Sequence, residues 1–147
     1  MARSGLDREL QMPNNAGQGR KVIVFPLVDN KPLHTQGLTR VEELDVAHIA
    51  KMGPMIEQMR IQFEGVDFSA EFEVSFFFKY SVTGHLWSSE KELLAAQTAD
   101  GQTMSAWYTS DQHFGMNLKF FMRYGNTAGV ADEDGRVTAY LEVVLKS

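Results

Sequence analysis

The chain has 147 residues, a net charge of −5 and a hydrophobic fraction of 44%, which fits one folded domain of ordinary composition. The acidic balance disfavours nucleic acid as a partner, and the absence of cysteine excludes disulfides and thiol-based metal sites. No apolar run approaches the roughly 18 residues of a membrane span, and the N-terminus lacks the apolar core of a signal peptide. We therefore expect neither nucleic acid nor a membrane as a partner.

Residues 1–20 differ from the rest of the chain because they are polar and contain few sizeable apolar side chains. Such a segment alone cannot bury enough surface to offset the entropy of ordering it. It either packs on its own domain or lies on a neighbouring subunit, and the second alternative is a hypothesis about function. We predict an extended N-terminal arm over residues 1–20, with Leu6, Leu10 and Met12 as partner-binding anchors.

The remaining residues, 21–147, read as one β domain. Residues 21–27 form a β-branched run, and Pro26 has no N–H for a ladder, which predicts an edge strand or a strand that bends. Alternation of apolar and polar side chains predicts further strands at 59–64, 72–82, 116–124 and 137–146, with a shorter one near 104–108.

One segment between these strands can be read in two ways. Thr39 and Glu42 have the spacing of a helix capping box, and Gly53-Pro54 would end a helix. The residues between them also suit a strand or an extended connection. The sequence leaves open whether residues 40–52 are helical.

Turn signals containing glycine separate the predicted strands, and helical patterns are few, which is typical of an antiparallel sandwich or barrel. We predict an all-β fold in which two antiparallel sheets form a jelly-roll-like β-sandwich. The alternation also selects the core between the sheets: Phe72, Val74, Phe76, Leu118, Phe120, Leu141 and Val143. Phe77 is the one residue that interrupts the polar face of its strand.

Catalytic motifs are missing from the sequence. His34, His48, His85 and His113 are dispersed, and neither a nucleophile elbow nor a phosphate-binding glycine loop is present. We expect no catalytic residue and no cofactor.

Two pairs of carboxylates deserve a functional interpretation beside a structural one. Glu71 and Glu73 share a strand face, as in sandwich-fold glycosidases, although a solvated outer face explains them as well. Asp132 and Asp134 resemble the start of a calcium loop, but the downstream ligands are missing, so we expect a solvated hairpin tip and no essential metal.

Three aromatic residues are candidates for a contact surface. Trp87, Trp107 and Tyr108 each have an apolar body and a polar tip. Such side chains suit core packing, a protein interface or a platform for a sugar ring. All three readings stay open.

A longer pattern carries a family resemblance. It comprises Tyr80–Ser88, Gln97–Gly101, Trp107, Phe120–Gly129 and Val137–Leu145. In order and type these segments resemble small jelly-roll proteins on tailed-phage and virus-like capsids, which act as decoration or minor structural subunits. Related modules often have Asp before the turn glycine, whereas this chain has Thr83 before Gly84.

The resemblance implies a non-enzymatic structural subunit located in the virion. Its partners would be a capsid or other virion protein, copies of itself, or both, in an oligomer. The alternative is a carbohydrate-binding β-sandwich module that uses Trp87, Trp107 or Tyr108 to hold a glycan. A third hypothesis, an enzyme with a sandwich fold, is supported by Glu71 and Glu73 alone.

Overall fold

The computed structural model describes residues 21–33, 39–68, 72–109, 114–126 and 135–146. The expected arm over residues 1–20 lies outside these ranges, and so do five candidate site residues: His34, Glu71, His113, Asp132 and Asp134. The arm and its anchors therefore stay predictions.

Strands dominate the described residues. In chain order they are β1 (Lys21–Pro32), β2 (Arg40–Leu44), β3 (Ile56–Val66), β4 (Phe72–Ser81), β5 (Lys91–Gln97), β6 (Gly101–Met104), β7 (Tyr108–Thr109), β8 (Asn117–Asn126) and β9 (Arg136–Leu145). A short 3-10 helix, Gly53–Met55, precedes β3.

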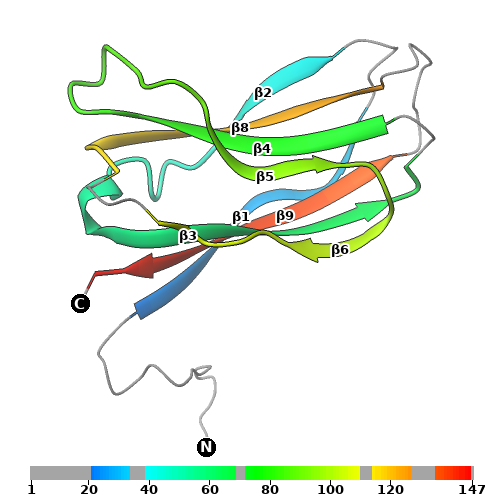
Figure 1. Cartoon of the computed structure of the whole chain (residues 1–147), viewed down its shortest axis with the longest axis horizontal. Coiled ribbons are helices and arrows are strands. Elements are labelled where there is room, and N and C mark those ends of the chain that lie inside the picture. The colour runs from blue at the N-terminus through cyan, green and yellow to red at the C-terminus, as the bar shows by residue number, and fades with distance from the viewer. Residues whose placement is uncertain (1–20, 34–38, 69–71, 110–113, 127–134, 147) are drawn as a thin grey trace, which may run out of the picture.

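The strands form two antiparallel sheets that lie as two layers (Figure 1). One sheet has the order β1-β9-β3-β6, with β7 also paired to β3, and the other has the order β2-β8-β4-β5. We call them the five-stranded and the four-stranded sheet. The predicted two-sheet antiparallel β-sandwich is confirmed. β1 is an edge strand, and its register against β9 shifts between Pro26 and Lys31, so both sequence readings of this strand are correct.

The core lies between the inner faces of the two sheets. All seven predicted core residues are buried, with no more than 2% of any side chain exposed. Alternation identified them because each strand has one face against the opposite sheet. Phe63 and Phe76, one from each sheet, meet edge to face with their ring centroids 6.1 Å apart.

The segment with two readings is a strand followed by a turn. β2 pairs with β8 along its whole length, from Arg40 opposite Tyr124 to Leu44 opposite Phe120. Helical geometry is limited to one turn, in which the N–H of Ala50 donates to the carbonyl of Val46 at 3.0 Å. Pairing with a long neighbouring strand outweighs the local helical signal, because a helix of this length is marginal alone.

Three strand assignments differ from the sequence prediction. β5 was not predicted, because its Leu-Leu and Ala-Ala pairs hide the alternation, and its register against β4 shifts twice. The strand expected near 104–108 is two strands, β6 and β7, separated by residues 105–107. β3 runs from Ile56 to Val66 and is longer at both ends than the strand predicted at 59–64.

Candidate functional site

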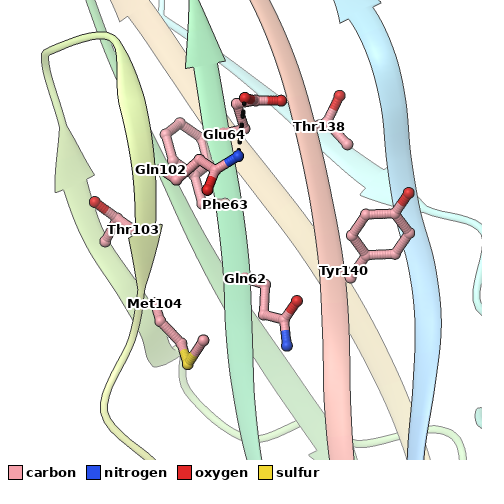
Figure 2. A pocket seen from close by; sticks show the side chains of 8 residues that line it. All are labelled: Gln62, Phe63, Glu64, Gln102, Thr103, Met104, Thr138 and Tyr140. Carbon is pink, nitrogen blue, oxygen red and sulfur yellow. Dashed lines mark hydrogen bonds between the residues drawn. The ribbon is translucent and has the colours of Figure 1, made fainter.

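The outer face of the five-stranded sheet contains a groove of about 320 Å³ (Figure 2). Two cross-strand rows build it. Gln102, Glu64 and Thr138 lie opposite one another on β6, β3 and β9. Met104, Gln62 and Tyr140 form the next row on the same three strands. None of these residues was singled out from the sequence, because their proximity depends on the register of strands far apart in the chain.

Hydrogen bonds orient the polar side chains of this groove. Nε2 of Gln102 donates to Oε2 of Glu64 at 3.2 Å. Nε2 of Gln62 donates to Oε1 of Glu142 at 2.9 Å, and the same oxygen accepts from Nε of Arg60 at 2.8 Å. Arg60 and Glu142 thus form a partly buried ion pair that fixes Gln62 from one side.

Of the three aromatic candidates, Trp107 is the one beside this face. The guanidinium carbon of Arg60 lies 4.1 Å from the centroid of the Trp107 ring, a cation–π contact. Because Arg60 is on the outer face of β3, Trp107 covers the row next to the groove.

Tyr108 lies on the inner side. Its ring packs edge to face on Phe78, with centroids 5.1 Å apart, and contacts Phe114 at 5.9 Å. Burial raises the pKa of the Tyr108 hydroxyl. Core packing therefore accounts for this ring.

Trp87 contacts the outer face of the four-stranded sheet. Nζ of Lys119, on the outer face of β8, lies 4.5 Å from the centroid of its ring. Trp87 also lines a second cavity, of about 400 Å³, between the β4–β5 loop and residues 43–51. The structure thus does not bring Trp87, Trp107 and Tyr108 together into one platform.

The loop after β4 exposes apolar side chains at one end of the sandwich. Val82 is 62% exposed, Leu86 is 82% exposed and Met116 is 49% exposed. Val82 and Met116 follow and precede the paired residues Ser81 and Asn117, so they are neighbours. We call these three residues the loop-end patch. Alternation predicted Val82 and Met116 to point inward, but both lie beyond the last paired residues of their strands.

Thr83 takes the turn position where the jelly-roll modules that the sequence resembles often have Asp. Its Oγ1 accepts from the backbone N–H of His85 at 3.1 Å and of Leu86 at 3.4 Å. Gly84 has a φ of +86°, a conformation that favours glycine. The Thr83 hydroxyl is thus the side-chain acceptor in this turn.

The outer face of the four-stranded sheet carries an ionic and aromatic cluster. The Glu90 carboxylate accepts from Nη2 of Arg123 at 2.7 Å, and this hydrogen bond holds the pKa of Glu90 below its usual value. The same bond raises the pKa of the Arg123 guanidinium. Arg123 also lies over the ring of Phe77 at 4.6 Å. These contacts explain Phe77, the residue that interrupts the polar face.

The remaining chemical candidates are scattered where they are described. His48 lies beside the ring of Phe25 with a centroid distance of 6.0 Å, and His85 is in the exposed β4–β5 loop. Glu73 is half-buried on the outer face of β4. Within the described ranges no three His, Asp or Glu residues gather as metal ligands would. In the same part of the chain, we find no helix with the length and apolar character to span a bilayer.

Comparison by sequence gives no relatives: no family model matches the chain, and no curated protein matches it either. Comparison by structure does find similar folds. The structure of the infectious bursal disease virus Gx strain matches 85% of this chain with a TM-score of 0.53 and 10% identity. The VP2 subviral particle of that virus matches the same share with a TM-score of 0.55 and 10% identity. The PBSX exported protein XepA matches 99% of the chain with a TM-score of 0.54 and 13% identity.

These likenesses concern the fold. The chain spans 32% of each matched virus chain and 44% of XepA, less than half of their lengths. The structural resemblance to viral capsid β-sandwich proteins, expected from the sequence pattern, is confirmed at the level of the fold.

Proposed function

We propose that this chain is a non-enzymatic structural subunit of a virus or phage particle, in the role of a decoration or minor virion protein. It would be located in the virion and act through contacts with a capsid or other virion protein, with copies of itself, or with both. The observation that carries the proposal is the match of 85% of the chain to the VP2 subviral particle.

The strand orders support the jelly-roll part of this proposal. The first and last strands, β1 and β9, lie side by side, and β2 pairs with β8 in the opposite sheet. An eight-stranded jelly roll has two four-stranded sheets between which the chain passes back and forth. The orders β1-β9-β3-β6 and β2-β8-β4-β5 agree with this arrangement, and β7 is an additional short strand beside β3.

The surface of the sandwich supports contacts with other proteins. The loop-end patch exposes Val82, its neighbour Met116 and, four residues after Val82 in the same loop, Leu86, and a partner would bury these side chains. The predicted arm over residues 1–20, if extended, reaches about 60–70 Å, far enough to cross a neighbouring subunit. The patch and the arm are two independent routes to assembly.

The proposal is tested on particles purified by density gradient from the source of this gene. We expect the chain in the particle band, at a fixed ratio to the major coat protein by quantitative mass spectrometry. A Leu86→Ser variant should lower that ratio, whereas Glu92→Gln, on a polar exposed site of β5, should leave it unchanged. The absence of the chain from the particle band would overturn the proposal.

A further inference from the structure

We propose that the groove on the outer face of the five-stranded sheet, formed by Gln62, Glu64, Gln102, Met104, Thr138 and Tyr140, binds a neutral oligosaccharide. This inference goes beyond the structural role and does not depend on it. It also differs from a platform built of Trp87, Trp107 and Tyr108, which the fold separates.

The size and position of the groove suit a small ligand. Its volume of about 320 Å³ falls within the range of small-molecule sites. It lies across β6, β3 and β9, and β3 is paired with a neighbour on each side. An extended peptide cannot add to β3 here, because the backbone groups of β3 are already paired on both sides, and a ligand lying over its outer face meets side chains.

The side chains across the floor are planar hydrogen-bonding groups. Gln62 and Gln102 each donate one amide N–H within the protein, which leaves the second N–H and the amide oxygen for a ligand. The carboxylate of Glu64 accepts from Gln102 through one oxygen, and its other oxygen can accept as well. Paired donors and acceptors of this kind match the adjacent hydroxyl groups of a sugar ring.

The two sides of the groove are apolar. Tyr140 is 38% exposed on one side of Gln62, and Met104 is 52% exposed on the other (Figure 2). Within the part of the chain that the structure describes, the Tyr140 hydroxyl makes no hydrogen bond, so the hydroxyl is available to a ligand, and the ring is partly exposed. A sugar has the same combination of an apolar C–H face and a polar edge.

Charge in the groove disfavours an anionic ligand. Among the described residues, Glu64 is the one charged side chain that lines the groove, and the charges of Arg60 and Glu142 beside it compensate each other at 2.8 Å. A sialylated or phosphorylated ligand would be repelled by Glu64, whereas a neutral glycan gains its hydrogen bonds without that cost.

The groove is also held in shape before any ligand binds. Glu142 orients Gln62, Arg60 orients Glu142, and the ring of Trp107 covers Arg60. A fixed amide loses less side-chain entropy on binding, which raises the affinity of each hydrogen bond.

The experiment uses the full chain on an array of immobilised neutral and sialylated oligosaccharides, followed by calorimetry with the strongest neutral binder. We expect binding to at least one neutral class and to no sialylated glycan. Tyr140→Ala and Gln62→Ala should each lower the affinity by about tenfold or more, since each removes a stacking or hydrogen-bonding group. Tyr140→Phe, which keeps the ring, should lose less.

Glu92→Gln, at an exposed site of β5 in the four-stranded sheet, is the control and should bind as the wild type does. Thermal melts check that each variant is folded. The proposal is wrong if no neutral glycan binds, or if Tyr140→Ala and Gln62→Ala both retain wild-type affinity. It is also wrong if these variants instead change the oligomeric state in sedimentation, because the face would then be a protein interface. The amount of the chain in purified particles is measured separately. Normal incorporation without glycan binding would overturn the glycan site and leave the structural role intact.

Discussion

The rings of Phe77 and Phe121 stack on the outer surface of the four-stranded sheet, with centroids 5.0 Å apart and planes 11° apart. They lie directly opposite each other on β4 and β8. Nζ of Lys79 lies 5.6 Å from the Phe121 ring, and the Arg123 guanidinium lies 4.6 Å from the Phe77 ring. This surface cluster buries Phe77 outside the main core and ties the two central strands of the sheet together.

Removal of this stack should cost measurable stability. We expect Phe77→Ala to lower the free energy of unfolding by about 3 kcal/mol, the lower end for a buried phenylalanine. A double-mutant cycle with Phe121→Ala should give a coupling energy of about 1 kcal/mol, typical of an aromatic pair. Urea unfolding of the four proteins measures both values. Additive effects of the two substitutions would mean that the rings do not interact in solution.

The core between the sheets should be more sensitive than the loop-end patch. Phe76 is 1% exposed and contacts Phe63, so Phe76→Ala should destabilise the protein by about 3–5 kcal/mol through lost burial and a cavity. Leu86→Ala should change stability by no more than about 0.5 kcal/mol, because Leu86 is almost fully exposed. Chemical denaturation of both variants tests the assigned strand register. Equal effects would contradict it.

Stability should fall at alkaline pH because of Tyr124. Burial, and then the nearby carboxylate of Glu42, raise the pKa of Tyr124, whose hydroxyl donates to Glu42 at 3.3 Å. A pKa that is higher in the folded than in the unfolded state gives stability that is complete below the unfolded value of about 10. That stability is lost as the pH rises through the folded pKa.

We therefore expect the free energy of unfolding of the wild type to decrease above about pH 10. In Tyr124→Phe the free energy of unfolding should decrease less over the same pH range. Tyr108→Phe, at a second tyrosine whose pKa burial raises, separates the two contributions. Denaturation curves at a series of pH values provide the measurement. An identical alkaline slope in wild type and Tyr124→Phe would show that Tyr124 does not contribute.

The turn after β4 should depend on an acceptor atom at position 83. Thr83→Ala removes the oxygen that accepts from His85 and Leu86, and we expect a loss of about 1 kcal/mol. Thr83→Ser keeps the hydroxyl, and Thr83→Asp supplies a carboxylate in its place, so both should retain most of the stability. Thermal melts compare the three variants. A loss in Thr83→Asp as large as in Thr83→Ala would contradict the acceptor role.

Residues 1–20 should be dispensable for folding and necessary for assembly. The described core is built from residues after position 20, so a protein of residues 21–147 should keep a cooperative melt. If the segment binds other chains through Leu6, Leu10 and Met12, its deletion should remove the chain from the particle. Calorimetry and particle composition measure the two effects. Loss of the fold on deletion, or unchanged incorporation, would count against the arm.

The alternation of side chains in the sequence determined the strands β3, β4, β8 and β9 and the seven core residues between the sheets. Alternation is a local property, because consecutive side chains of any strand point to opposite faces. It failed for β5, where Leu93 and Leu94 are both buried next to a register shift. It also left residues 40–52 open, because pairing with β8 decided their conformation.

Tertiary structure alone decided which residues meet. Lys21 pairs with Leu145, and Gln62 lies between Met104 and Tyr140, although long stretches of chain separate them. These juxtapositions depend on the order and register of the strands, which are set by packing of the whole core. No single position of the sequence indicates them. For the same reason the sequence identified Trp87, Trp107 and Tyr108 as candidates by residue type but did not indicate that they point to different faces. The groove around Tyr140 exists because three strands distant in the chain are neighbours in the sheet.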